Sequence, residues 1–158
     1  MTRLNEGDVA PHFTATDHKG RDVTLDELRG QRVVLYFYPA DDTPGCTKEA
    51  CQFNDGLDDF ADLDVRVIGV SPDDGASHRA FREKYGLRFD LVSDPERTVM
   101  TAYGAYGEKM MYGRRVQGVI RSTIVIGPTG RVEHAFYNVR ADGHAAKVLA
   151  ALGQKRDG

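Results

Sequence analysis

Two short apolar runs stand out along the chain, at Val33–Tyr38 and Val65–Val70. Both are rich in β-branched and aromatic residues, which predicts strands that are buried on both faces of a sheet. Between the runs, apolar side chains recur at intervals of three and four residues, which predicts an amphipathic helix from about Pro44 to Leu63. The apolar stripe of this helix consists of Cys46, Ala50, Phe53, Leu57 and Phe60. This order predicts a strand–helix–strand unit in the fold.

Turn and capping signals predict the remaining elements. They are hairpin strands at Phe13–Thr16 and Arg21–Thr24, a short helix capped at Thr24, a helix capped by Ser77 that runs to Tyr85, a strand at Phe89–Val92, a helix opened by Asp94 and Pro95, a second pair of hairpin strands at Val119–Ile126 and Val132–Tyr137, and a final helix from Asp142 to about Leu152. This order predicts an α/β fold, in which a mixed central β-sheet is flanked by helices. It is compatible with a thioredoxin-like fold.

The composition is that of a soluble globular protein. Of 158 residues, 41% are hydrophobic and 28% are charged, which suits one domain spanning residues 1–158. The formal net charge is only -3 and the basic residues are scattered, so neither nucleic acid nor a membrane is expected as a partner. The first residues lack the apolar core of a signal peptide, and no apolar run could span a bilayer, so we expect a cytoplasmic location.

The sequence contains only two cysteines, Cys46 and Cys51. A permanent structural disulfide is not expected in a reducing cytosol, so the pair is catalytic, metal-binding or merely buried. A structural zinc site usually takes four protein ligands at recognisable spacings, whereas the histidines here are dispersed, so we expect no metal. A small buried side chain on the apolar stripe is the plain structural alternative for Cys46.

The residues before Cys46 favour a reactive sulfur. Thr43 is a good N-cap residue and Pro44 a good first helical residue, which places Cys46 third in the helix. Backbone N–H groups in this first turn have no intrahelical acceptor, and the positive end of the helix dipole points at the sulfur. Both effects favour a thiolate, which is the nucleophilic form of cysteine.

A thiolate alone does not make a fast reaction, because charge also develops on the leaving atom and needs hydrogen-bond donors. Suitable donors are the Thr43 hydroxyl, the backbone N–H groups of Gly45 and Cys46, and an arginine. Gly45 also has no side chain to obstruct a small substrate. The residue pattern does not choose among the arginines, since Arg121 on a predicted strand would ordinarily be a solvated residue.

The spacing of Cys46 and Cys51 sets a geometric condition. Five residues along an α-helix give roughly 7.5 Å of rise and about 140° of rotation, which separates the two Cα atoms by roughly 8–9 Å. Disulfides need Cα separations of about 4.4–6.8 Å. If both cysteines lie on one intact helix, a disulfide between them requires the start of the helix to unwind.

The segment from Phe37 to Cys51 closely resembles the active-site motif of the peroxiredoxins. It contains the pattern Pro-x-x-x-Thr-x-x-Cys at Pro39–Cys46, and a second cysteine five residues later is the mark of the Q-type, or bacterioferritin comigratory protein, subfamily. The segment Gly118–Thr123 looks like the family segment that carries an active-site arginine, here Arg121. The resemblance covers nearly the whole chain.

The resemblance implies a thioredoxin fold with an N-terminal β-hairpin addition, and a thiol peroxidase that reduces hydrogen peroxide and organic hydroperoxides without metal or bound cofactor. It implies that Cys46 is the peroxidatic cysteine and Cys51 the resolving one, joined in an intramolecular disulfide during the cycle. It further implies catalytic roles for Thr43 and Arg121, which hold the thiolate and the peroxide oxygens. The remaining implied site residues are Pro39, which shields the sulfur, Gly45, and Glu49, which orients the arginine.

The implied reductant is thioredoxin or a similar dithiol protein. We expect a monomer, with a weak homodimer as the alternative, because two cysteines on one helix require no partner subunit. A general thiol–disulfide oxidoreductase is a rival function, although its usual signature is Cys-x-x-Cys and the gap here is longer. A redox-responsive binding protein or holdase, in which the disulfide switches a surface, is a rival from another class.

Overall fold

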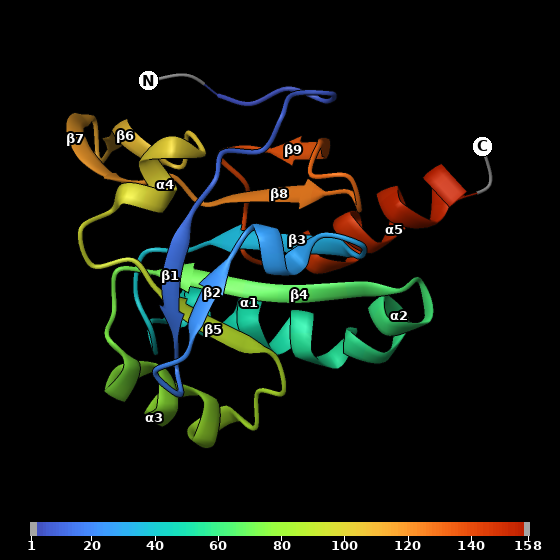
Figure 1. Cartoon of the computed structure of the whole chain (residues 1–158). Coiled ribbons are helices and arrows are strands. Elements are labelled where there is room, and N and C mark those ends of the chain that lie inside the picture. Colours follow the sequence, from blue (N-terminus) through green and yellow to red (C-terminus); the bar gives the residue numbers. More distant parts are fainter. Residues whose placement is uncertain (1–2, 157–158) are drawn as a thin grey trace.

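A seven-stranded mixed sheet forms the centre of the computed structural model, which describes residues 3–156 (Figure 1). Its strands are β1 (Thr14–Asp17), β2 (Asp22–Thr24), β3 (Arg32–Phe37), β4 (Val65–Ser71), β5 (Asp90–Ser93), β8 (Ser122–Ile126) and β9 (Val132–Phe136), in the order β2-β1-β5-β4-β3-β8-β9. Strands β3, β4 and β5 run parallel, whereas β1, β2, β8 and β9 pair antiparallel with their neighbours. The predicted mixed sheet and the N-terminal hairpin are both confirmed.

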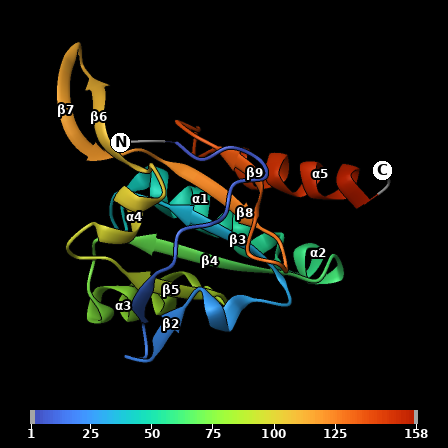
Figure 2. The ribbon, with the colours of Figure 1, turned by 45° about the horizontal axis from the view of Figure 1, so that its top comes forward.

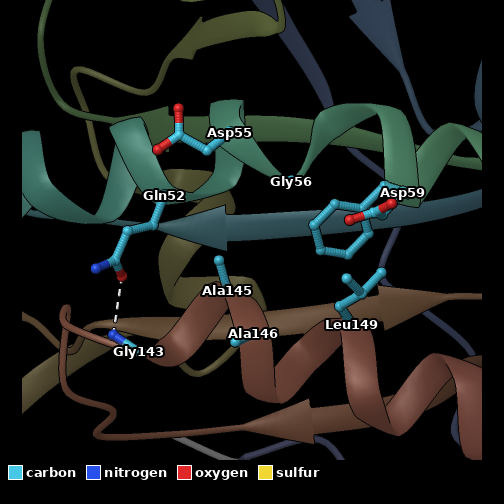
Figure 3. Close-up of a pocket in the computed structure, with 9 residues that line it drawn as sticks. Gln52, Asp55, Gly56, Asp59, Gly143, Ala145, Ala146 and Leu149 are labelled. Carbon is cyan, nitrogen blue, oxygen red and sulfur yellow. Dashed lines mark hydrogen bonds between the residues drawn. The ribbon is translucent and has the colours of Figure 1, made fainter.

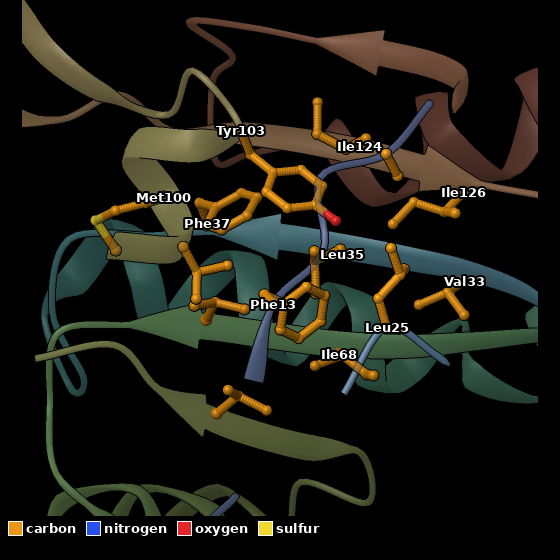
Figure 4. Close-up of a cluster of buried hydrophobic side chains, with 14 of the residues drawn as sticks. Phe13, Leu25, Val33, Leu35, Phe37, Ile68, Met100, Tyr103, Ile124 and Ile126 are labelled. Carbon is orange, nitrogen blue, oxygen red and sulfur yellow. The ribbon is translucent and has the colours of Figure 1, made fainter. Parts of the chain in front are cut away.

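Helices cover both faces of the sheet. They are the 3₁₀-helix η1 (Asp26–Leu28) and the α-helices α1 (Pro44–Asp55), α2 (Leu57–Asp62), α3 (Gly75–Tyr85), α4 (Thr98–Ala102) and α5 (His144–Arg156). Side chains of α1, α2, α3 and α5 pack into one hydrophobic cluster with the sheet. Side chains of η1 and α4 join a second cluster on the other face (Figure 4). None of the helices among the described residues is long and apolar enough to cross a membrane.

Strand β3 is buried on both faces, as its apolar run predicts. Val34 and Tyr36 belong to the cluster beneath α1, whereas Leu35 and Phe37 belong to the cluster on the opposite face. This alternation follows from the two-residue period of a strand. Each such side chain gains about 1.5–3 kcal/mol from burial, so the end of β3 is a rigid base for the segment that follows it.

The helix predicted from Pro44 to Leu63 is wrong in one respect, because it is two helices that meet at Gly56. Gly56 has φ of -88° and ψ of 4°, which departs from helical geometry. Its amide still donates to the Gln52 carbonyl at 3.1 Å, and its own carbonyl accepts from Phe60 at 3.1 Å. Glycine has low helix propensity, and this turn lets Phe60 bury completely against the core.

The strand predicted at Val119–Ile126 is also wrong, because it is divided at Ile120 and Arg121. The first part is the end of β7 (Arg114–Val119), which pairs with β6 (Tyr106–Met111) in a separate two-stranded sheet. Figure 2 shows this hairpin projecting from the body of the molecule. Its turn residues Tyr112 and Gly113 both have positive φ, as a two-residue hairpin turn of type I′ requires. The residue pattern missed this hairpin because tyrosine is not a usual first turn residue.

Several helix starts differ from the predicted ones. Asp74, rather than Ser77, caps α3, because its side chain accepts from the Ser77 amide at 2.9 Å. Helix α4 begins at Thr98, after the predicted start at Asp94 and Pro95, while the Asp94 carboxylate accepts from amides inside it. The final helix begins at His144 rather than at Asp142. The predicted end of α3 is confirmed, since Gly86 follows it with φ of 63°.

Candidate active site

Cys46 lies in the first turn of α1, just beyond the carboxyl end of β3. Thr43 is the N-cap residue with extended backbone angles, Pro44 is the first helical residue, and Cys46 is the third, as predicted. The Cys46 side chain is buried, with 2% of its surface exposed. The first intrahelical bond runs from the Thr47 amide to the Thr43 carbonyl, at 2.8 Å. The N–H groups of Gly45 and Cys46 therefore precede the helical ladder and have no acceptor within it.

Arg121 contacts the Cys46 sulfur although it lies 75 residues later in the chain. Its Nη2 donates to Cys46 Sγ at 3.3 Å, and its Nη1 donates to Glu49 Oε1 at 2.6 Å. Only 17% of its side-chain surface is exposed. The expectation of a solvated strand residue is thus wrong, because Arg121 lies in the break between β7 and β8 rather than within a strand. Its carbonyl accepts from the Val139 amide at 3.0 Å, which fixes this break.

Glu49 lies three residues after Cys46 and hence on the same face of α1. It is fully buried. Burial raises the pKa of Glu49 to about 7, against the opposing effect of the nearby Arg121 charge. Burial also works against the charge of Arg121, but Glu49 and Cys46 outweigh it and raise the pKa of the guanidinium. The three residues therefore form one coupled unit in which the arginine stays charged.

Gly45, the residue before Cys46, is exposed. A Cβ atom at Gly45 would lie 3.4 Å from Arg121 Nη2 and 3.8 Å from Ala141 Cβ. The missing side chain therefore leaves free space directly against the guanidinium. The role of Gly45 in admitting a small substrate stays a prediction.

Thr43 is exposed at the mouth of the site, and its hydroxyl donates to the Ala40 carbonyl at 3.0 Å. Its side chain makes no capping bond to α1, although it occupies the N-cap position. The hydroxyl oxygen keeps its lone pairs for an incoming hydrogen-bond donor. Pro39 is half-buried in the loop between β3 and α1. Its shielding of the sulfur stays a prediction.

Cys51 lies on the same unbroken helix as Cys46, and both are free thiols. The condition set by the spacing is therefore met: in this conformation the intervening helix keeps the two sulfurs from bonding. Cys51 is half-buried. Burial and the neighbouring charge of Asp55 raise the pKa of its thiol, so Cys51 is held in its protonated form.

The residue pattern missed a latch between α1 and the residues just before α5, which is formed by Gln52, Asp142 and Gly143. Gln52 Nε2 donates to Asp142 Oδ1, and Gln52 Oε1 accepts from the Gly143 amide, both at 2.8 Å. Figure 3 shows the second bond at one end of a groove between the two helices. The two partners are 90 and 91 residues from Gln52, and no local pattern marks such a contact.

That groove is separate from the sulfur site. It has a volume of about 370 Å³, and its lining includes Phe60 and Leu149 but neither cysteine. Within residues 3–156, no three His, Cys, Asp or Glu side chains gather where they could hold a metal ion.

Comparison with known proteins places this geometry in a family. Residues 7–135 match the AhpC/TSA family. Over 151 residues the chain is 55% identical to a putative peroxiredoxin of Mycobacterium tuberculosis, covering 96% of each. Over 149 residues it is 38% identical to peroxiredoxin Bcp of Escherichia coli K12, covering 94% of this chain and 96% of the relative.

Solved structures give the same result. A cysteine-to-serine variant of peroxiredoxin Q from Xylella fastidiosa matches with a TM-score of 0.91 and 38% identity over 99% of both chains. A Xanthomonas campestris bacterioferritin comigratory protein, described for its alkyl peroxide reduction activity, matches with a TM-score of 0.85 and 40% identity over 90% of this chain and 91% of that one. These neighbours share the thioredoxin-like peroxiredoxin fold. The chain therefore belongs to the AhpC/TSA family, as a peroxiredoxin of the Q, or bacterioferritin comigratory protein, type.

Proposed function

We propose that the protein is a thiol-dependent peroxidase that reduces hydrogen peroxide and organic hydroperoxides, with Cys46 as its nucleophile. The observation that carries this proposal is the contact of 3.3 Å between Arg121 Nη2 and Cys46 Sγ at the open N-terminus of α1. A buried cysteine with no reactive role has no need of a charged donor held against its sulfur. The alkyl peroxide reduction described for the Xanthomonas campestris relative supports the same chemistry.

In the first step, the Cys46 thiolate attacks one oxygen of the hydroperoxide and the O–O bond breaks. The bonding electrons leave with the other oxygen, which takes up a proton and departs as water or an alcohol, and Cys46 becomes a sulfenic acid. Arg121 and the amides of Gly45 and Cys46 stabilise the charge that moves between the oxygens. Thr43 accepts the hydrogen of the bound hydroperoxide, because its own hydroxyl hydrogen is directed to Ala40. Pro39 limits the access of water to the sulfur.

In the second step, the first turns of α1 unwind and Cys51 reaches the sulfenic acid. The Cys51 thiol displaces water from the Cys46 sulfur, and an intramolecular disulfide forms. Burial keeps Cys51 protonated while the helix is intact, and unwinding removes that burial, so the thiol gains reactivity only when the helix opens. Thioredoxin or a similar dithiol then reduces the disulfide by exchange and returns both thiols.

This cycle uses no metal, bound cofactor or second subunit, which favours a monomer. Its dependence on free thiols favours the cytoplasm, where thiols are kept reduced. All of its residues belong to one domain, residues 1–158.

The test is a reaction of reduced protein with one equivalent of hydrogen peroxide, followed by intact mass and thiol titration. We expect rapid loss of both thiols and a mass decrease of two hydrogens. Cys46→Ser should abolish peroxide consumption, whereas Cys51→Ser should allow the first oxidation and stall the recycling by thioredoxin. Survival of both thiols while peroxide persists would overturn the proposal and favour disulfide exchange on protein substrates instead.

A further inference from the structure

A cluster of buried polar side chains joins the loop between β3 and α1 to the start of α3. At its centre is Asp41, two residues before Thr43. Asp41 Oδ2 lies 2.7 Å from His78 Nδ1 and accepts from Ser77 Oγ at 2.8 Å, while Asp41 Oδ1 accepts from the Tyr38 hydroxyl at 2.6 Å. The side chains of His78 and Asp41 are 0% and 3% exposed. No step of the peroxidase cycle uses this pair.

The hydrogen-bond partners determine where the protons lie. His78 Nε2 is 3.1 Å from the Val92 carbonyl, which can only accept, so Nε2 carries a hydrogen. Asp41 accepts from two hydroxyl groups, and His78 Nδ1 is its third polar neighbour. The two ring nitrogens of His78 thus connect Asp41 with the backbone of Val92 in β5. A buried carboxyl group needs hydrogen-bond partners to offset its removal from water, and three side chains surround this one.

The same cluster ties the loop to the ends of three other elements. The Asp41 amide donates to Asp73 Oδ2 at 2.7 Å, and Asp73 Oδ2 also accepts from Ser71 Oγ, at the end of β4, at 2.8 Å. His78 belongs to α3, and its other nitrogen contacts Val92 in β5. Asp41 is thus held by β4, by α3 and, through His78, by β5.

The next residue is held from the same helix. Asp42 has φ of 57°, a left-handed conformation that costs a non-glycine residue about 1 kcal/mol or more. Its carboxylate accepts from Lys84 Nζ at 2.8 Å and from the Tyr85 hydroxyl at 2.7 Å, both at the end of α3. A strained residue persists when its surroundings fix it, and α3 supplies these contacts.

We propose that His78 is a positioning residue for the peroxidatic site, which acts through Asp41 on the loop that carries Thr43 and starts α1. The inference rests on the proposed function, because it concerns the geometry of the Cys46 reaction. It also keeps the loop before α1 in one position during the cycle. The first turns of α1 unwind and refold in each turnover, and the loop before them returns Thr43 and Cys46 to the same places because His78 holds Asp41 throughout.

Two neutral variants separate the contact with Asp41 from the contact with Val92. The amide nitrogen of His78→Asn falls near the position of Nδ1 and can still donate to Asp41. That of His78→Gln falls near Nε2 and can keep only the bond to Val92. We expect His78→Gln to lower the second-order rate constant for Cys46 oxidation by hydrogen peroxide about 10- to 100-fold, and His78→Asn to recover a large part of the loss.

The matched control is Arg82→Met, which lies on the same helix. It removes a hydrogen bond of 3.0 Å from α3 to the Phe89 carbonyl but no contact with the loop between β3 and α1. It should therefore lower the unfolding temperature with little effect on the rate constant. If the histidine variants do not fold, a milder variant, Ser77→Ala, serves in their place. It removes one donor from Asp41 and should lower the rate constant about threefold.

Two results would overturn the inference: a folded His78→Gln with the original rate constant, or equal losses of rate constant in His78→Gln and Arg82→Met. These are distinct from failure of the proposed function. In that case the unaltered protein itself would leave peroxide unconsumed and its Cys46 thiol intact.

Discussion

Arg121 and Cys46 are 75 residues apart in the chain, yet Arg121 Nη2 lies 3.3 Å from Cys46 Sγ. The same guanidinium binds Glu49 through its other nitrogen, so one planar group spans two side chains on a single face of α1. A guanidinium can make both contacts at once because its N–H groups lie in a rigid fork. The position of the arginine is therefore set by the helix that carries its target.

Replacing Arg121 by lysine keeps the charge but loses the fork. A single ammonium group cannot reproduce both contacts, so we expect Arg121→Lys to lower the rate constant for Cys46 oxidation about 10²- to 10³-fold. Stopped-flow measurement with hydrogen peroxide checks this. Arg115→Lys, on the exposed pair with Glu108 in the projecting hairpin, is the control and should react normally. An Arg121→Lys variant as fast as the control would show that the fork is unimportant.

Glu49 should make stability fall as pH rises. Its pKa is raised from the usual 4.5 to about 7 in the folded protein, so between these values the folded state holds a proton that the unfolded state has lost. The free energy of unfolding therefore decreases across this window, by about 3 kcal/mol from this group. Glu49→Gln cannot titrate. Urea unfolding at several pH values should show the difference between the two proteins changing from pH 4.5 to 7, and a constant difference would contradict this.

His144 should have the opposite effect. Burial chiefly lowers its pKa to about 4, with Lys147 and Arg121 adding to the shift, and its Nε2 lies 2.7 Å from Thr123 Oγ1. Between pH 6.5 and 4, His144 binds a proton in the unfolded state but not in the folded state. Stability is therefore lost as pH falls through this window, by up to about 2 kcal/mol. The stability of His144→Gln, measured by thermal or urea unfolding, should depend less on pH over this range than that of the original protein. An equally steep decline in the variant would count against this prediction.

Because Glu49 and His144 act in opposite directions, their contributions offset each other between about pH 4.5 and 6.5. The unaltered protein can then show a shallow profile that hides both groups. Only the single variants separate them.

Gln52 should govern how readily the disulfide forms. Its two hydrogen bonds to Asp142 and Gly143 hold α1 against the segment that leads into α5, and each is worth about 0.5–1.5 kcal/mol. Gln52→Ala should leave Cys46 oxidation unchanged and speed closure of the disulfide several-fold, about 3- to 10-fold, as measured by timed alkylation after a peroxide pulse. Gln117→Ala, on the projecting hairpin, is the control. If closure keeps its original rate, the opening does not involve this latch.

Gly45 should set the room available to the substrate. A Cβ atom there would be in ordinary contact with Arg121 Nη2 at 3.4 Å, so Gly45→Ala should fold normally. It would narrow the approach to the sulfur, so the reaction of Cys46 with tert-butyl hydroperoxide should slow more than its reaction with hydrogen peroxide. Comparison of the two rate constants, with Gly153→Ala as a distant control where a Cβ meets no neighbour, tests this. Equal effects on both substrates would indicate displacement of Arg121 rather than crowding.

The residue pattern was most informative where the determinants are local. The buried run of β3, the N-cap at Thr43 and the third helical position of Cys46 all depend on neighbours in sequence, and all are confirmed. The pattern failed at Gly56 and at the β7–β8 break, because each depends on how a segment packs against the rest of the fold. It also left Arg121 unselected among the arginines, since only the resemblance to the peroxiredoxins pointed to it.

The cluster around Asp41 illustrates the same limit. Histidine on the predicted helix after Val65–Val70 carries no sign that it will meet a carboxylate 37 residues earlier in the chain. Long-range polar contacts between loops and helices leave no period in the sequence. They become visible only when the sheet order places α3 beside the end of β3.

The interruption at Gly56 bears on how much of the molecule must melt for Cys51 to reach Cys46. Helix formation is cooperative, so fraying that begins in one turn spreads along a continuous helix. Here α1 contains 12 residues and ends at Asp55, and α2 begins afresh with its own core contact at Phe60. Local melting can then stop at the glycine. Hydrogen exchange should show α1 opening as an independent unit while the amides of α2 remain protected, which keeps the cost of each catalytic opening well below that of global unfolding.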